Sequence, residues 1–333
     1  MTNVADTLVV GISTAGFNST FWIGVGILAA IYTIVALGLQ MNVGFTGMDN
    51  FGMAGFMAIG AYAMAILTVD QGFSFWLSLP ASMAITMAFG LLVGLPSLRL
   101  RSDYFAIATI ASSELIRLVA QNAQSLTGGN QGFFCSDDFS TCYDDTWVKV
   151  SDTINGWFTD LGMTDPPSAL PLLVVAWIVA MILTVVLARV QNTPWGRVLR
   201  AIREDEDAAR ALGKNTVAYK LQSLVIASAV ASIAGWLLAL NLATVHPTDY
   251  EPIVTFFAYS VLVLGGLANY WGVALGSIFF WTLVEGTRTL ELFESESQQV
   301  ALRLFVAGAV LIGVMVFRPQ GAFGKKEEMV LGD

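Results

Sequence analysis

Long apolar runs alternate with short polar segments along the whole chain. Each run approaches the roughly 20 residues that a helix needs to cross the hydrocarbon core of a membrane. Backbone groups in lipid must be paired within their own segment, so the runs predict helices and an all-α polytopic membrane protein. The short runs near 104–120 and 253–287 predict broken or re-entrant helices. The nine runs are Phe21–Leu39, Phe51–Val69, Phe75–Leu95, Tyr104–Ala120, Ala169–Ala188, Leu221–Val245, Ile253–Ala268, Trp271–Thr287 and Ala301–Phe317.

The distribution of Lys and Arg predicts the orientation, because cytoplasmic loops carry most of these residues. Of the 16 in the chain, seven fall within 189–220, and Arg318 and Lys325 lie beyond the last run. The loop at 128–168 instead holds seven Asp and a single Lys, which is typical of an external segment. Counting crossings between these segments predicts nine spans, with the N-terminus outside and the C-terminus inside.

This topology divides the chain into three parts. An extracytoplasmic segment at 1–20 precedes a transmembrane domain at 21–324, and a cytoplasmic tail follows at 325–333. The external loop contains both cysteines of the chain, Cys135 and Cys142. Their spacing permits a disulfide in an oxidising compartment, and two free thiols are the alternative.

Composition agrees with this class and excludes several others. Hydrophobic residues make up 56% of the chain and charged residues 12%, against about a quarter charged in soluble domains. The net charge of −9 arises in acidic loops and gives no basic surface for nucleic acid. One His and two Cys do not form a metal constellation. The Gly213-Lys214 pair lacks the remainder of a phosphate-binding loop, so we expect no bound cofactor and no ATP hydrolysis by this chain.

The segment Arg200–Lys220 concentrates charge in a chain that otherwise avoids it. Acidic residues come early in DEDAARALG, Arg210 comes late, and Gly213 follows as a C-cap. This order favours a short amphipathic helix between two spans. The alternative is a solvated loop whose positive residues only enforce the topology.

A family resemblance rests on this segment and on five others. The arrangement Asp207-Ala208-Ala209, three residues and Gly213 resembles the E-A-A-x-x-x-G loop of ABC importer permeases, with Asp in place of the usual Glu. The longer stretch TPWGRVLRAIREDEDAARALGKNTVAYKL resembles branched-chain amino acid permeases of the LivM type. The same family resemblance continues, in order, in GLQMNVGFTGMDNFGMAGFMAIGAYAMAIL, LRLRSDYFAIATIASSELIRL, SLTGGNQG, VLGGLANYWGVALGS and FRPQGAFG.

The resemblance implies a permease subunit in a bacterial cytoplasmic membrane. Its expected partners are a second homologous permease, two cytoplasmic ABC ATPases that use ATP and Mg²⁺, and an extracytoplasmic substrate-binding protein. Branched-chain or other hydrophobic amino acids are the implied substrates; urea or short amides are the alternative within the family, and an ion-coupled secondary transporter is the alternative outside it. The implied ATPase-coupling residues are Arg200, Arg203, Glu204, Glu206, Asp207, Ala208, Ala209 and Gly213.

Polar residues inside the apolar runs are candidates for the translocation path. Glycines and polar residues crowd Asn42–Asn50, which is consistent with tight helix packing or with a partly unwound stretch beside a cavity. Glu114 and Arg117, like Glu285 and Arg288, are spaced for an ion pair on one helix face. A structural pair and a contribution to the path are both open for the first of these. The candidate path residues are Asn42, Thr46, Asn50, Glu114 and Asn269.

Overall fold

The computed structural model describes residues 18–98, 102–134, 144–163, 166–267, 269–289 and 296–317. The expected all-α class is confirmed there, since the β-structure is one antiparallel pairing of β1 (Phe133–Phe134) with β2 (Thr244–Val245). Cys135 and Cys142 lie outside the described residues, as do the tail at 325–333 and most of the segment at 1–20. The predictions for these parts therefore stay predictions.

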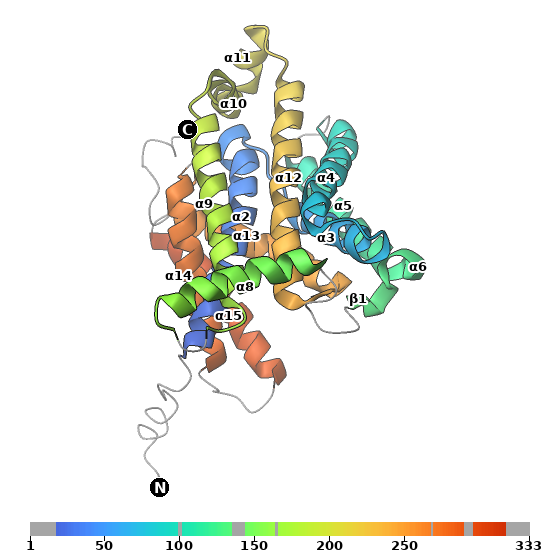
Figure 1. Cartoon of the computed structure of the whole chain (residues 1–333). Coiled ribbons are helices and arrows are strands. Elements are labelled where there is room, and N and C mark those ends of the chain that lie inside the picture. The colour runs from blue at the N-terminus through green and yellow to red at the C-terminus, as the bar shows by residue number, and fades with distance from the viewer. Residues whose placement is uncertain are drawn as a thin grey trace.

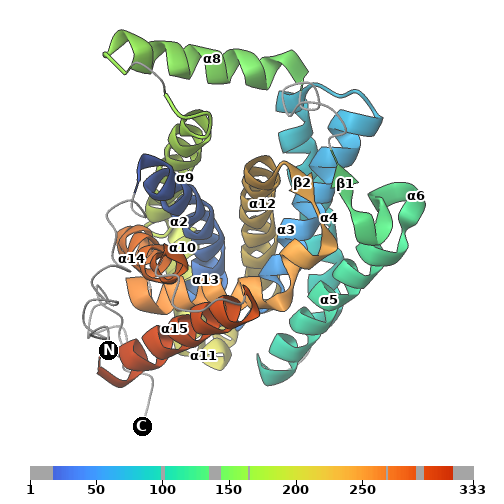
Figure 2. The same cartoon turned by 90° about the horizontal axis from the view of Figure 1, so that it is seen from below.

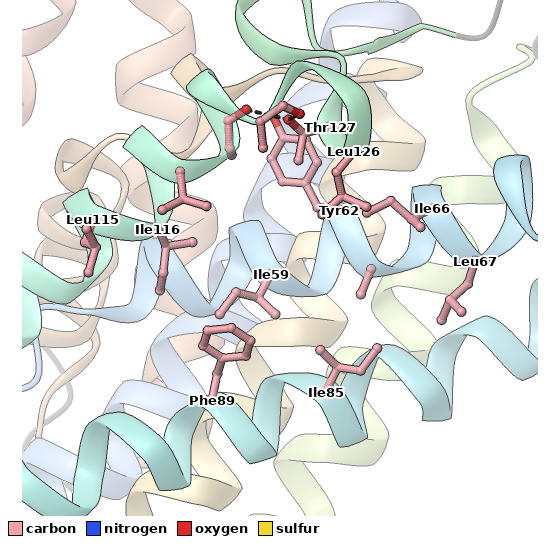
Figure 3. Close-up of a pocket in the computed structure, with 14 residues that line it drawn as sticks. Ile59, Tyr62, Ile66, Leu67, Ile85, Phe89, Leu115, Ile116, Leu126 and Thr127 are labelled. Atoms are coloured by element: carbon pink, nitrogen blue, oxygen red, sulfur yellow. Dashed lines mark hydrogen bonds between the residues drawn. The ribbon is translucent and has the colours of Figure 1, made fainter.

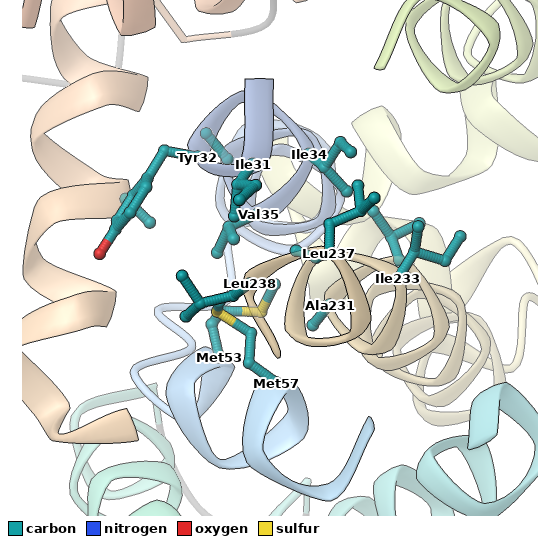
Figure 4. Packing of buried hydrophobic residues seen from close by; sticks show 14 of the residues in the cluster. Ile31, Tyr32, Ile34, Val35, Met53, Met57, Ala231, Ile233, Leu237 and Leu238 are labelled. Atoms are coloured by element: carbon teal, nitrogen blue, oxygen red, sulfur yellow. The ribbon is translucent and has the colours of Figure 1, made fainter. Parts of the chain in front are cut away.

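Three helices form the centre of the bundle: α2 (Ser19–Gln40), α3 (Met53–Ala65) and α12 (Thr216–Leu242). Their side chains are apolar on every face, which is the pattern of a helix surrounded by other helices. Figure 4 shows Ile31 and Val35 of α2 packed against Met53 of α3 and Leu238 of α12, all of them buried. The core of the protein lies between these three helices.

The other elements surround this centre or connect its helices (Figure 1). The helices are α4 (Phe75–Ser97), α5 (Ser102–Asn122), α6 (Gln124–Thr127), α8 (Asp144–Asp160), α9 (Leu170–Val190), α10 (Pro194–Glu204), α11 (Glu206–Ala211), α13 (Pro252–Gly265), α14 (Tyr270–Thr289) and α15 (Glu296–Phe317). Two π-helical segments, η2 (Met41–Phe45) and η3 (Ile66–Asp70), extend α2 and α3, and two 3₁₀ turns are η4 (Gly129–Gln131) and η5 (Pro247–Tyr250).

Each of the nine predicted apolar runs falls on a helix, but fewer helices qualify as spans. Within the described residues, six are long and apolar enough to cross a membrane, and the pair α13 and α14 adds at most one more. These two helices are bent by 117° at the break between them, where two crossings were expected. The helix α5 has 21 residues but is not among the six, and it carries Asp103, Glu114 and Arg117. The count of nine spans is not confirmed.

The two predicted loop regions lie at opposite ends of the bundle. In Figure 1, α10 and α11 form one end, whereas α8 and the β1–β2 pairing lie toward the other. The helix α8 runs across the bundle there, and Trp147 packs against Phe75 with ring centroids 5.7 Å apart. Opposite placement agrees with the crossing argument, while the absolute orientation stays a prediction.

The ion pair expected from the spacing of Glu285 and Arg288 has a different main partner. The buried carboxylate of Glu285 accepts a hydrogen bond from Arg303 of α15, while Arg288 lies 4.0 Å away and is exposed. Arg303 also stacks over the ring of Trp281, 5.4 Å from its centroid. The pair therefore joins α14 to α15, because the neighbouring helix offers a less exposed cation than the next turn of α14.

We expect Arg303→Met to destabilise the protein by roughly 3 kcal/mol or more, because it leaves the Glu285 carboxylate buried without its main partner. Arg288→Met is the matched control and should cost less than about 1 kcal/mol, since that pair is exposed. Thermal unfolding of the purified protein in detergent measures both. Equal shifts in the two variants would contradict the assignment of Arg303 as the main partner.

Candidate functional site

The charged segment between α9 and α12 folds as two short helices rather than the single helix expected. Thr193 accepts a hydrogen bond from the Gly196 amide at the start of α10, and Pro194 occupies its first position, where no amide donor is needed. The chain leaves helical geometry at Asp205, with φ −153° and ψ 105°. The side chain of Asp205 then accepts from the Ala208 amide at 2.9 Å and begins α11. An acidic residue that caps the second helix thus separates it from the first.

Gly213 ends α11 as predicted. Its φ is +78°, and the amides of Gly213 and Lys214 donate to the carbonyls of Arg210 and Ala209. This pair of bonds is the Schellman arrangement, in which a left-handed residue closes the last turn of a helix. A β-carbon at Gly213 would meet nothing within 4 Å, so glycine is favoured by backbone conformation and not by space.

Ion pairs hold α11 against the start of α12. The carboxylate of Glu206 pairs with Lys220 and accepts from Arg210 at 3.0 Å, and Arg210 also reaches Asp207 at 3.1 Å. Burial alone would raise the pKa of Glu206, but the hydrogen bond and charge of Lys220, with Thr216 and Arg210, hold that pKa below its usual value. Glu206 therefore stays ionised and links the two helices.

Two arginines of α10 contact the π-helical end of α2. The guanidinium of Arg203 donates to the Gly44 carbonyl at 2.6 Å, and its side chain lies against Gly47, whose φ is +65°. Arg200 stacks over Phe45 at 5.7 Å and donates to the Gln191 carbonyl at 3.1 Å. Both implied coupling arginines thus lie between the polar segment and the membrane bundle.

The segment that receives these arginines also contacts two other helices. Phe45 stacks on Tyr270 at the start of α14, with ring centroids 5.5 Å apart. The Ser223 hydroxyl of α12 donates to the Met41 carbonyl at 3.0 Å and to Asn42 Oδ1 at 3.2 Å. A displacement of η2 would therefore reach both α12 and α14.

Of the two alternatives for Asn42–Asn50, the structure has the partly unwound stretch, with a π-helical turn at Met41–Phe45 and non-helical backbone at 47–52, and the candidate side chains lie there. Asn42, Thr46 and Asn50 are all buried. Thr46 donates to the Asn42 carbonyl at 2.6 Å, and Asn50 Oδ1 accepts from the Gly52 amide at 2.8 Å. The side chains of Thr46 and Asn50 thus bond backbone groups where the helix is interrupted, and Asn42 Oδ1 accepts from the Ser223 hydroxyl. The place of all three residues in a translocation path stays a prediction.

The other two candidates lie elsewhere. Asn269 accepts from the Gly272 amide at 3.2 Å and so sits at the start of α14, after the break that follows α13. Glu114 lies on α5 and accepts from Arg117 Nε at 2.9 Å, as the three-residue spacing predicted. The five candidates are therefore distributed over three parts of the bundle.

The outer surface of α11 contains one residue that the sequence argument missed. Of the implied coupling residues, Ala209 is buried, whereas Glu204, Asp207 and Ala208 are exposed. Leu212 follows the helix and is 82% exposed. Its signal in the sequence was a leucine directly before the capping glycine.

An apolar cavity of about 360 Å³ lies between α3, α4, α5 and α6, and none of its lining residues belongs to α10 or α11 (Figure 3). Ile59, Ile85, Phe89 and Leu115 are among its lining residues, and Tyr62 and Thr127 are its polar members. Among the described residues no group of His, Cys, Asp or Glu is placed to hold a metal ion.

Comparison with known proteins gives one family. The profile described as "Branched-chain amino acid transport system / permease component" matches residues 9–315. The chain is 33% identical to the high-affinity branched-chain amino acid transport system permease protein LivM of Escherichia coli (strain K12), over 90% of this chain and 69% of that protein. No solved structure matches it.

Two further relatives extend the comparison. A probable branched-chain amino acid transport permease protein LivM of Methanocaldococcus jannaschii is 28% identical, with 89% of this chain and 91% of that protein aligned. The high-affinity branched-chain amino acid transport system permease protein LivH of Escherichia coli (strain K12) is 25% identical, over 90% and 93% of the two chains. The chain is thus similar to permease proteins of both names.

We expect Gly213→Val to loosen the end of α11, because a β-branched residue in left-handed geometry costs roughly 1–2 kcal/mol. Trypsin should then cut after Arg210 and Lys214 about fivefold faster or more in the purified protein. Gly213→Asn is the control and should stay near the wild-type rate, since Asn tolerates this conformation. If trypsin cut the valine variant at the wild-type rate, the left-handed turn at Gly213 would not be what orders this segment.

Proposed function

Because the chain belongs to the family of permease components of branched-chain amino acid transport systems, we propose that it is the membrane subunit of an ABC importer. Partner ATPases would drive it through α10 and α11. The observation that carries this proposal is the contact of α10 with the broken end of α2, where Arg203 bonds the Gly44 carbonyl at 2.6 Å. A charged segment that only enforced topology would need no such contact with the bundle.

The proposed ATPase contact is the exposed surface of α11. It presents Leu212 beside Ala208 and Asp207, and charged residues around a small apolar centre are typical of a non-obligate interface. The ion pair of Glu206 with Lys220 makes α11 move together with α12. A push or pull on α11 would therefore act on two rigid elements at once.

The proposed route into the membrane runs through η2. Arg203 and Arg200 contact η2 from the cytoplasmic side, Ser223 bonds it from α12, and Phe45 stacks on Tyr270 of α14. A π-helical segment has fewer constraints than a continuous α-helix and is frequent at functional sites. We infer that closure of the ATPases shifts η2 and so repositions α12 and α14 around the path.

The proposed substrates are branched-chain amino acids, which the printed names of the relatives give for their own transport systems. An external binding protein would supply affinity, and the permease a path of low affinity. Urea or a short amide is the alternative substrate class. Similarity to both LivM and LivH of one organism supports pairing with a second, related permease.

The proposed location is the cytoplasmic membrane of a bacterium, with α10 and α11 inside the cell. Chemistry belongs to the partners in this scheme, since the family is one of transport permeases and not of enzymes. ATP and Mg²⁺ would therefore be bound by the ATPase subunits.

Arg203→Met tests the coupling route, because it removes a charge-assisted hydrogen bond to η2. We expect the ATPase to co-purify as before, while amino acid uptake per ATP hydrolysed falls about tenfold in reconstituted vesicles. Arg197→Met is the matched control, since Arg197 is exposed on the same helix and its guanidinium donates to the nearby Asn192 carbonyl at 3.3 Å. It should leave uptake unchanged.

Two outcomes would overturn the proposal. Equal uptake by the Arg203 and Arg197 variants would remove the coupling route. Uptake by vesicles that contain this chain alone, driven by a sodium or proton gradient, would instead identify an ion-coupled secondary transporter.

A further inference from the structure

The apolar cavity between α3, α4, α5 and α6 takes no part in the proposed coupling route. Figure 2 shows these four helices together at one side of the bundle, away from α9 and α14. Buried residues such as Ile59, Ala63 and Ala120 form the floor of the cavity, whereas Phe89 of α4 and Leu115 of α5 line it and are exposed. The cavity is therefore open at the surface of the bundle.

Two walls of the cavity are helices long and apolar enough to cross a membrane, α3 with η3 (Met53–Asp70) and α4 (Phe75–Ser97). The lining residues of α4 are Ile85 and Phe89, near the middle of that helix, and those of α3 and η3 fall within 59–67. The middle of a span lies in the hydrocarbon core of the membrane, which is about 30 Å thick. The cavity therefore lies at the depth of lipid acyl chains.

The cavity has almost nothing to offer a charged or hydrogen-bonding ligand. Tyr62 and Thr127 are the two polar members of its lining, and Figure 3 shows both at its α6 end. Thr127 Oγ1 already lies 2.8 Å from the Ala123 carbonyl, and the Tyr62 hydroxyl is enclosed by protein. A bound water needs two to four polar partners, and the charged groups of an amino acid need more. The ligand that fits is therefore apolar.

The side chains at the opening are typical of a surface that faces lipid and not another helix. Helix contacts inside a membrane are enriched in small residues, because these let two backbones approach closely. The small residues of α4 are used against α12, since a β-carbon at Gly90 would lie 2.6 Å from Ser228 Oγ. At the cavity α4 instead presents Ile85 and Phe89, both exposed. Lipid thus fits this opening better than a second protein chain does.

We propose that the cavity is a binding site for one acyl chain of a membrane phospholipid. An apolar cavity of roughly 150 Å³ stays dry and binds benzene, so one of about 360 Å³ can hold a longer apolar group. The π-helical turn η3 supplies Ile66 and Leu67 to its wall, and such turns are frequent at functional sites. The bound chain fills the space between α5 and the spans α3 and α4. This site is separate from the substrate path and from the ATPase contact.

Photocross-linking tests whether a lipid chain occupies the cavity. The assembled importer is placed in phosphatidylethanolamine vesicles that contain a phosphatidylcholine with a diazirine in one acyl chain. Illumination should label lining residues of α5 such as Leu115 and Val119. Ala63→Phe fills the cavity from α3 and should reduce this labelling about fivefold or more. The matched control is Ala88→Phe, which adds the same side chain to α4 at an exposed position outside the cavity and should leave the labelling unchanged.

Two results would overturn the proposal. Equal labelling of the Ala63 and Ala88 variants would show that the chain does not enter the cavity, and absence of label at the lining residues of the wild type would show that lipid does not reach it. Neither result depends on substrate uptake or on coupling to the ATPases, so failure of this proposal is distinct from failure of the proposed function.

Thermal unfolding in detergent gives an independent measurement with a second variant. Phosphatidylethanolamine added to the delipidated protein should raise the melting temperature of the wild type and of Ala88→Phe by about 3 °C or more, because a ligand of the folded state stabilises it. Ala123→Phe fills the cavity from the turn between α5 and α6 and should show less than about half of this shift. A full shift in the Ala123 variant would place the stabilising lipid elsewhere and overturn the proposal.

Discussion

Every polar backbone group that a broken helix exposes inside a membrane must find a partner within the protein. The break between α2 and α3 meets this requirement with side chains from several helices. Arg203 donates to the Gly44 carbonyl, and the Ser223 hydroxyl donates to the Met41 carbonyl. The Phe51 amide donates to the Thr109 hydroxyl, and the Ala54 amide donates to the Thr255 hydroxyl. The break therefore joins α10, α12, α5 and α13 at one place.

In the proposed coupling mechanism, this junction is the place where the polar segment of α10 and α11 would act on the apolar bundle. The centre of the bundle is closely packed around α2, α3 and α12, and such a core does not deform continuously. The hydrogen bonds at the break are directional and few. A small displacement of the backbone there would therefore exchange hydrogen-bond partners. The proposed coupling route therefore begins at the contact of α10 with η2.

Three groups of charged residues in the described bundle differ in what they join and in how far they are exposed. Glu285 with Arg303 is mostly enclosed and joins two helices, whereas Glu114 with Arg117 remains open at the edge of α5. The charged side chains of α11 are exposed, apart from Glu206, which pairs with Lys220 of α12. The groups differ most in the burial of their carboxylates, because Glu285 is buried whereas Glu114 and Asp207 are more exposed.

Local pattern in the sequence determined the helical class, the break after α13 and the closure of α11 at Gly213, and it offered the unwinding near Asn42–Asn50 as one of two alternatives. These features depend on periodicity, charge order and glycine over a few residues, and such signals need no knowledge of distant neighbours. The sequence also indicated the family, because several blocks of residues resemble that family in the same order along the chain.

Tertiary structure alone decided which groups meet. Arg203 and Gly44 are 159 residues apart, and Ser223 and Met41 are 182 apart, so no local spacing predicts their bonds. Glu285 takes Arg303 from the adjacent helix in preference to the predicted Arg288 because packing encloses that side of α14. The open edge of α5 is likewise a property of what the other helices leave uncovered, and only the packed bundle determines that.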